Sequence, residues 1–189
     1  MKALAVKEGT YTESGMIGVM VHFEGFNDFI PFTASPDDTE EHGRQLYADL
    51  KAGKYGPVTP FSVTPEMIQS AKDAKHAEIN NWRDTQENGS VIFTLNSHRW
   101  DCGKASQTRL APVVAVGKSG ALPPGFFWTD ADNIDVPMTA DELTALEAAM
   151  QQNMVLQGFK IHECQRQMKE EMEALTTLAD IRNYRVGWL

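Results

Sequence analysis

The sequence has few of the features that define secreted, membrane-spanning or nucleic-acid-binding proteins. Its two cysteines are too few for a disulfide framework, which fits a reduced compartment. No apolar run approaches the ~18–20 residues that cross a bilayer, and the first apolar run is too short for a secretory signal. Basic side chains are scarce, because 17 Lys and Arg face 26 Asp and Glu for a net charge of −9. This balance disfavours nucleic acid as a partner, so we expect an acidic, soluble protein made in the cytoplasm.

The composition itself is that of an ordinary globular protein. Hydrophobic residues make up 42% and charged residues 23% of the 189 residues, enough for one domain or two small ones. The pattern predicts an α+β fold with a small N-terminal β-α unit over 1–62 and a connector helix over 63–89. A C-terminal α+β domain is expected over 90–189, in which short β-hairpins pack on a long helix over 140–175.

In the N-terminal unit, residues 17–23 and 27–32 are rich in strand-forming side chains. Pro31 cannot donate a backbone hydrogen bond, so the second of these strands is expected at a sheet edge. Ser35 and Pro36 precede two aspartates, a pattern that predicts the start of a helix ending near Gly53.

The clearest single element is the long helix. Thr139 and Glu142 form a capping box before a run of apolar residues spaced three or four apart. At 1.5 Å per residue the segment 140–175 would be ~54 Å long, longer than a domain of this size is wide. Part of its stripe should then meet another chain, which makes it the expected interaction site. The stripe residues are Leu143, Leu146, Met150, Met154, Ile161, Cys164, Met168 and Met172.

Large aromatic residues in the short strands predict the core of the C-terminal domain. Trp100, Trp128 and Phe127 have little else to bury against in about 100 residues. We expect all three to pack against the base of the long helix.

Motifs for chemistry fail at decisive positions. Residues 117–119 read Gly-Lys-Ser, but a phosphate-binding loop needs a glycine where Pro112 stands. The loop 130–135 lacks the glycine that a calcium loop needs at its sixth position. His162 and Cys164 would point about 200° apart on a helix and cannot share a zinc ion. We therefore predict no catalytic residue, no cofactor and no metal site.

A set of spaced motifs lies between about residue 76 and residue 188, and a further stretch covers 29–61. The motifs are Asn81-Trp82-Arg83, Trp100-Asp101-Cys102, Ser106-Gln107, the run from Trp128 to Asn133, the capped helix from Thr139, and Thr176-Thr177-Leu178. This part resembles an uncharacterised domain often found in phage tail and tail-fibre-associated proteins. The stretch 29–61 is similar to an N-terminal segment common in small proteins from the tail gene clusters of tailed bacteriophages and prophages.

The resemblance implies a non-enzymatic structural or adaptor component of a bacteriophage tail, at the tail tip or fibre attachment region. It would be made in the host cytoplasm and end in the virion tail. Its partners would be other tail proteins and copies of itself, with a trimer favoured because tail tips commonly have threefold or sixfold symmetry. One alternative is a cytoplasmic chaperone for tail-fibre assembly that is absent from the mature virion. A less favoured one is a tail-associated cell-wall hydrolase. The family offers no active residue to carry over.

Overall fold

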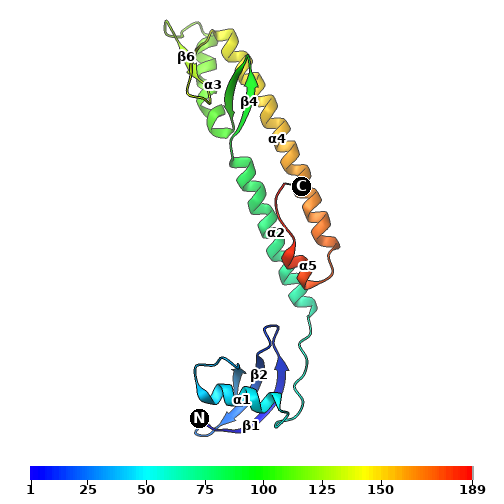
Figure 1. Cartoon of the computed structure of the whole chain (residues 1–189). Coiled ribbons are helices and arrows are strands. Elements are labelled where there is room, and N and C mark those ends of the chain that lie inside the picture. Colours follow the sequence, from blue (N-terminus) through cyan, green and yellow to red (C-terminus); the bar gives the residue numbers. More distant parts are fainter. Residues whose placement is uncertain (189) are drawn as a thin grey trace. The chain divides into compact units, whose positions relative to one another are not determined.

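The computed structural model describes residues 1–188 and divides the chain into two compact units, Met1–Thr64 and Pro65–Leu189. Within the described residues, the first unit holds a three-stranded sheet and one helix, and the second holds two β-hairpins and four helices. The fold class is α+β, with hairpins packed on a long C-terminal helix, which confirms the predicted class (Figure 1).

The sheet of the first unit is an antiparallel meander of β1 (Ala3–Tyr11), β2 (Ile17–Phe23) and β3 (Ile30–Ala34). In the central strand β2 every second side chain is buried, which is typical of a strand with one face on a core. Pro31 lies in β3 at the edge of the sheet, as predicted. Strand β1 is not among the strands expected from the sequence.

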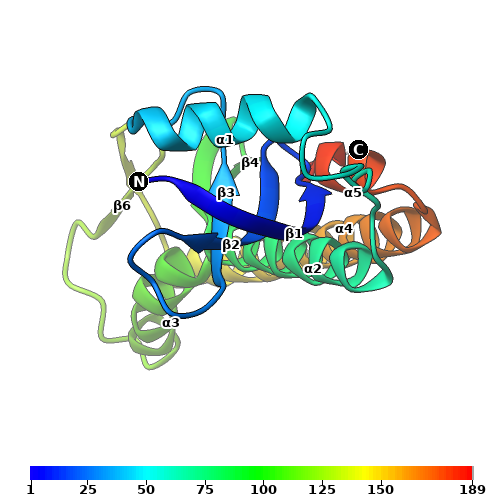
Figure 2. The same ribbon diagram turned by 90° about the horizontal axis from the view of Figure 1, so that it is seen from below.

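Helix α1 (Glu41–Lys51) covers the buried face of this sheet, and Leu46 and Leu50 enter the same core as β2 (Figures 1 and 2). It begins later than predicted. Ser35 Oγ accepts a hydrogen bond from the backbone N–H of Asp37, and Asp38 Oδ1 accepts one from Glu40, so these polar residues close tight turns ahead of the helix.

After α1 the chain returns to the outer edge of β1. The backbone N–H of Thr59 donates to the carbonyl of Gly9, and that of Tyr11 donates to the carbonyl of Thr59, both at 2.9 Å. One edge of the sheet is thus partly paired by this segment and the other carries Pro31. A covered edge and an edge with a proline both offer few free backbone groups, which limits pairing with the edge of another sheet.

The second unit contains an antiparallel pair of helices, α2 (Pro65–Asn88) and α4 (Ala140–Ala174). Helix α5 (Leu178–Asn183) turns back to lie against α2 (Figure 1). We call α2, α5 and the second half of α4 the arm. The segment 63–89, expected as a separate connector, is packed into the second unit through α2.

The other end of this unit, which we call the head, surrounds the first half of α4. Its first hairpin turns at Asn96 and Ser97, both with positive φ, as a two-residue hairpin turn requires. Helix α3 (Lys104–Lys118) continues through Pro112. Proline has no N–H to donate to the carbonyl of Thr108, but both residues are exposed, so water can bond that carbonyl instead. The head elements are β4 (Val91–Leu95), β5 (His98–Cys102), α3 (Lys104–Lys118), β6 (Phe127–Thr129) and β7 (Asp135–Pro137).

The aromatic residues predicted for the head core divide into three cases. Trp100 is 3% exposed and lies in the core, and Trp128 is half-buried against it. Phe127 is 49% exposed, so its predicted burial was wrong. Neighbouring residues of a strand point to opposite faces, and this hairpin packs with the face that carries Trp128.

Candidate interaction surfaces

The stripe predicted as an interaction site runs along one side of α4, and we call it the inner seam. It comprises the eight residues Leu143, Leu146, Met150, Met154, Ile161, Cys164, Met168 and Met172. All are buried except Met154, which is half-buried against the head. The chain itself therefore covers this side of the helix.

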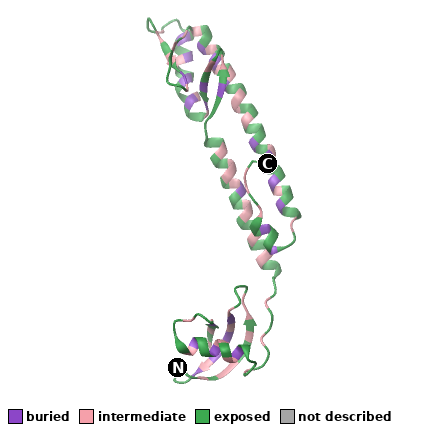
Figure 3. Cartoon of the chain, in the orientation of Figure 1, coloured by how far each residue is buried: buried purple, intermediate pink, exposed green. Residues whose placement is uncertain are grey.

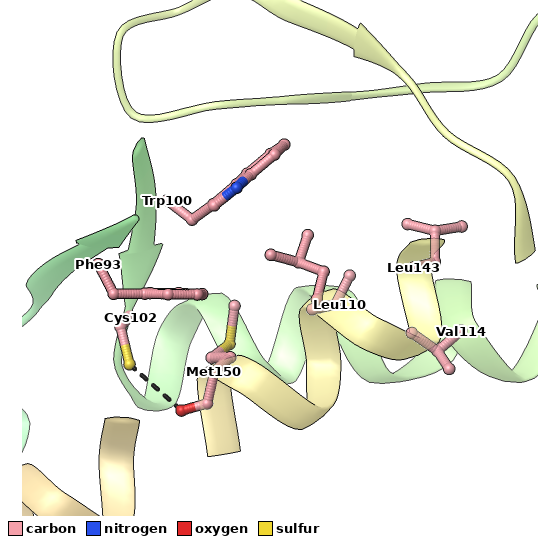
Figure 4. Packing of buried hydrophobic residues seen from close by; sticks show 8 residues of the cluster. Phe93, Trp100, Cys102, Leu110, Val114, Leu143 and Met150 are labelled. Atoms are coloured by element: carbon pink, nitrogen blue, oxygen red, sulfur yellow. Dashed lines mark hydrogen bonds between the residues drawn. The ribbon is translucent and has the colours of Figure 1, made fainter. Parts of the chain in front are cut away.

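At the head, the inner seam joins a cluster of aromatic and aliphatic residues from the first hairpin and α3 (Figure 4). Leu143, Leu146 and Met150 pack there with side chains that include Phe93 and Trp100. The Cys102 thiol donates to the carbonyl of Met150 at 3.5 Å. Burial raises the pKa of Cys102, so this thiol stays protonated and acts as a small apolar side chain.

In the arm, Cys164, Met168 and Met172 pack on Ile79 of α2. Helix α4 extends well beyond the head, and α2 folds back along it and supplies its partner there. The sequence led us to expect that part of this seam meets another chain, whereas in the structure elements of the same chain cover it. The physical reason for placing a trimer interface on this seam is removed.

Polar contacts join α2 to the far end of α4. The carboxylate of Glu173 lies 2.7 Å from His76 Nε2 and 3.0 Å from Lys72 Nζ, and Lys72 also donates to the Glu173 carbonyl. The hydrogen bond from His76, with that from Lys72, holds the pKa of Glu173 below its usual value. These contacts help to set the register of the two helices, because they hold the first half of α2 beside the last turn of α4.

A buried carboxylate links the two hairpins of the head. Asp130 Oδ1 accepts hydrogen bonds from the backbone N–H groups of Asp132 and Ile134, and Oδ2 lies 2.9 Å from His98 Nδ1. The backbone N–H of Ile134 and the His98 ring lower the pKa of Asp130, so the side chain is an anion that the hairpin loop stabilises. The loop 130–135, which lacks the glycine of a calcium loop, is thus a turn closed by the Asp130 carboxylate.

Among the described residues 1–188, no group of three or more His, Cys, Asp or Glu side chains is placed to hold a metal ion. Within the same residues, no helix combines the length and apolar character that crossing a membrane requires. The predicted absence of catalytic residues and cofactors stays a prediction.

A protein-family model, Domain of unknown function (DUF4376), matches residues 70–185, which is more than half of the chain. The chain belongs to this family. The DUF4376 match begins within α2 and extends beyond α5, so it takes in the whole head and nearly all of the arm. The N-terminal unit lies outside it. No curated protein and no solved structure matches the chain.

The DUF4376 part carries an exposed apolar surface on α4 that is not among the residues predicted as an interaction site. Near the middle of α4, Val155, Leu156 and Phe159 are 72%, 54% and 65% exposed. They fall off the inner seam, which is why its periodicity did not include them. The sequence does mark this surface in another way, by a lack of charge: no side chain from Ala148 to Phe159 is charged. Solvent-facing helix surfaces normally carry charged residues, so this stretch is unusual for an exposed face.

Proposed function

We propose that the protein is a non-enzymatic structural adaptor of a bacteriophage tail, located at the tail tip or fibre attachment region. It is made in the host cytoplasm and becomes part of the virion tail, where it binds other tail proteins. The residues that resemble phage tail proteins give the context for this proposal. The observation that carries the adaptor role is the division of the chain into two units with separate cores.

The two cores share no residue. One is built on Ile17, Val19 and Phe23 with Leu46 and Leu50, and the clusters of the second unit draw only on residues after Pro65. Residues 60–64 between the units have no regular secondary structure. Each unit can therefore keep its own fold while it binds a different component, which is what an adaptor requires. We assign the N-terminal unit as a docking domain for another tail protein.

Mass spectrometry of purified phage particles tests this proposal. If the protein is a structural component, its peptides will be present in particles at amounts comparable to those of other minor tail proteins. Detection in the lysate of producing cells but not in the particles would contradict the structural role and support a tail-fibre assembly chaperone. A known tail protein with few copies serves as the detection control.

A further inference from the structure

We propose that a second copy of this chain binds antiparallel to the exposed side of α4, about a twofold axis near the middle of the helix. The inference does not depend on the tail proposal. It rests on four exposed residues in the charge-free stretch of α4, spaced alternately four and three apart. These residues are Ala148, Gln152, Val155 and Phe159.

The same spacing continues on both sides of the stretch. Ala145 and Asp141 precede it, and His162 and Arg166 follow it, all of them exposed. We call these eight positions the outer seam. At 3.6 residues per turn they form one line, about 38 Å long and roughly opposite to the inner seam. A line of residues alternating three and four apart is the contact geometry of paired helices.

Among the described residues of the second unit, none belongs to an element that covers this side of the helix. The inner seam faces the head and α2, and Figure 3 shows α4 with its buried residues toward α2 and exposed residues on its outer side. Val155 and Phe159, at 72% and 65% exposed, are the largest apolar side chains on the outer seam. A second helix can approach there without displacing any contact of the head or arm.

The order of residues favours an antiparallel copy of the same helix. About an axis midway between Gln152 and Val155, Phe159 of one copy meets Ala148 of the other, so a large side chain faces a small one. Further out, the same symmetry brings Arg166 to Asp141, which pairs opposite charges at both ends. A parallel copy would instead place Phe159 on Phe159 and Asp141 on Asp141.

The charge pairing is compatible with the contacts already made in one chain. Arg166 bonds Glu163 and Glu170 on its own helix, at 3.0 and 2.7 Å, and its side chain remains 53% exposed. A guanidinium has five N–H donors, so it can also reach an aspartate of the partner. Because a twofold interface uses one patch on both chains, each favourable pair occurs twice.

The mass of the full chain in solution tests the pairing. We expect twice the 21.0 kDa chain mass in sedimentation equilibrium at hundreds of micromolar, and a monomer for Phe159→Asp. The matched control is Phe127→Asp, because Phe127 is also exposed but lies on β6, and this variant should remain a dimer. Phe159 is exposed, so its substitution should leave the circular dichroism spectrum unchanged. A monomeric or trimeric unmodified chain, or a dimeric Phe159→Asp, would overturn the proposal.

Cysteine cross-linking tests the direction of the helices. The antiparallel register places Ala145 of one copy beside His162 of the other, whereas two copies of Ala145 lie about 25 Å apart along the helix. We therefore expect Ala145→Cys and His162→Cys chains to cross-link when mixed under oxidation, and neither to cross-link alone. The native Cys102 and Cys164 are buried and should not compete. A cross-link in Ala145→Cys alone would overturn the antiparallel arrangement.

Discussion

The head and the arm stabilise the same helix by different means. The head core contains eight buried residues, among them Phe93 and Trp100, whereas the arm core contains four, three of which carry sulfur. Polar contacts occur in both regions but at different places. In the head, Asp130 joins the two hairpins to each other. In the arm, polar contacts join α2 to α4, such as Gln165 to Asn80 at 3.0 Å and the contacts of Glu173. The packing of α4 in the head core should therefore respond mainly to changes in apolar volume. The pairing of α4 with α2 in the arm should respond to charge and pH as well, because polar contacts join these two helices directly.

Truncation of Trp100 should have the largest effect. Trp100→Ala removes a nearly fully buried aromatic side chain from the head, at an expected cost of about 3–5 kcal/mol. Urea unfolding followed by circular dichroism measures the loss. Phe127→Ala is the control, since Phe127 is exposed and should change the free energy of unfolding by less than about 0.5 kcal/mol. Equal effects of the two changes would contradict the assignment of the head core.

Truncation in the arm should cost less and act locally. Met168 is 0% exposed and packs on Ile79, so Met168→Ala should cost about 2–4 kcal/mol. Hydrogen exchange should show the loss of protection concentrated in α2 and the second half of α4. If protection falls as much in β4 and β5 as in α2, the head and the arm form one cooperative unit and the contrast between them does not hold.

The sequence predicted what depends on local pattern. The capping box at Thr139 and the edge position of Pro31 follow from single residues and their neighbours. The sequence could not predict that α2 covers the arm part of the inner seam. Helix α2 has one buried residue, Ile79, and the polar residues around it are typical of a helix exposed to solvent. The outer seam was missed because the apolar inner seam dominates the periodicity of α4.

A capping box stabilises the end of α4 that lies in the head. At the head end, Thr139 accepts from the backbone N–H of Glu142, and the Glu142 carboxylate accepts from the backbone N–H of Thr139. Thr139→Ala should cost about 1 kcal/mol in urea unfolding because it leaves helix N–H groups without a partner. Thr144→Ala on the same helix is the control and should be close to neutral. Equal losses would show that the cap contributes nothing of its own.

The smallest expected effect is the acid sensitivity of the arm. The pKa of Glu173 is lowered from 4.5 in the folded chain, chiefly by the hydrogen bond from His76. Its contribution to stability is therefore complete above about pH 4.5 and is lost as the pH falls through the lowered folded pKa. Glu173→Gln should lower the urea midpoint at pH 7, and its difference from the wild type should shrink as the pH falls below 4.5, so the two proteins converge in acid. Glu170→Gln is the control. The Glu170 carboxylate forms an ion pair with Arg166 on its own helix, so it is not one of the contacts that join α4 to α2. A gap between wild type and Glu173→Gln that persists undiminished at pH 3 would mean that Glu173 stabilises the arm by packing and not by charge.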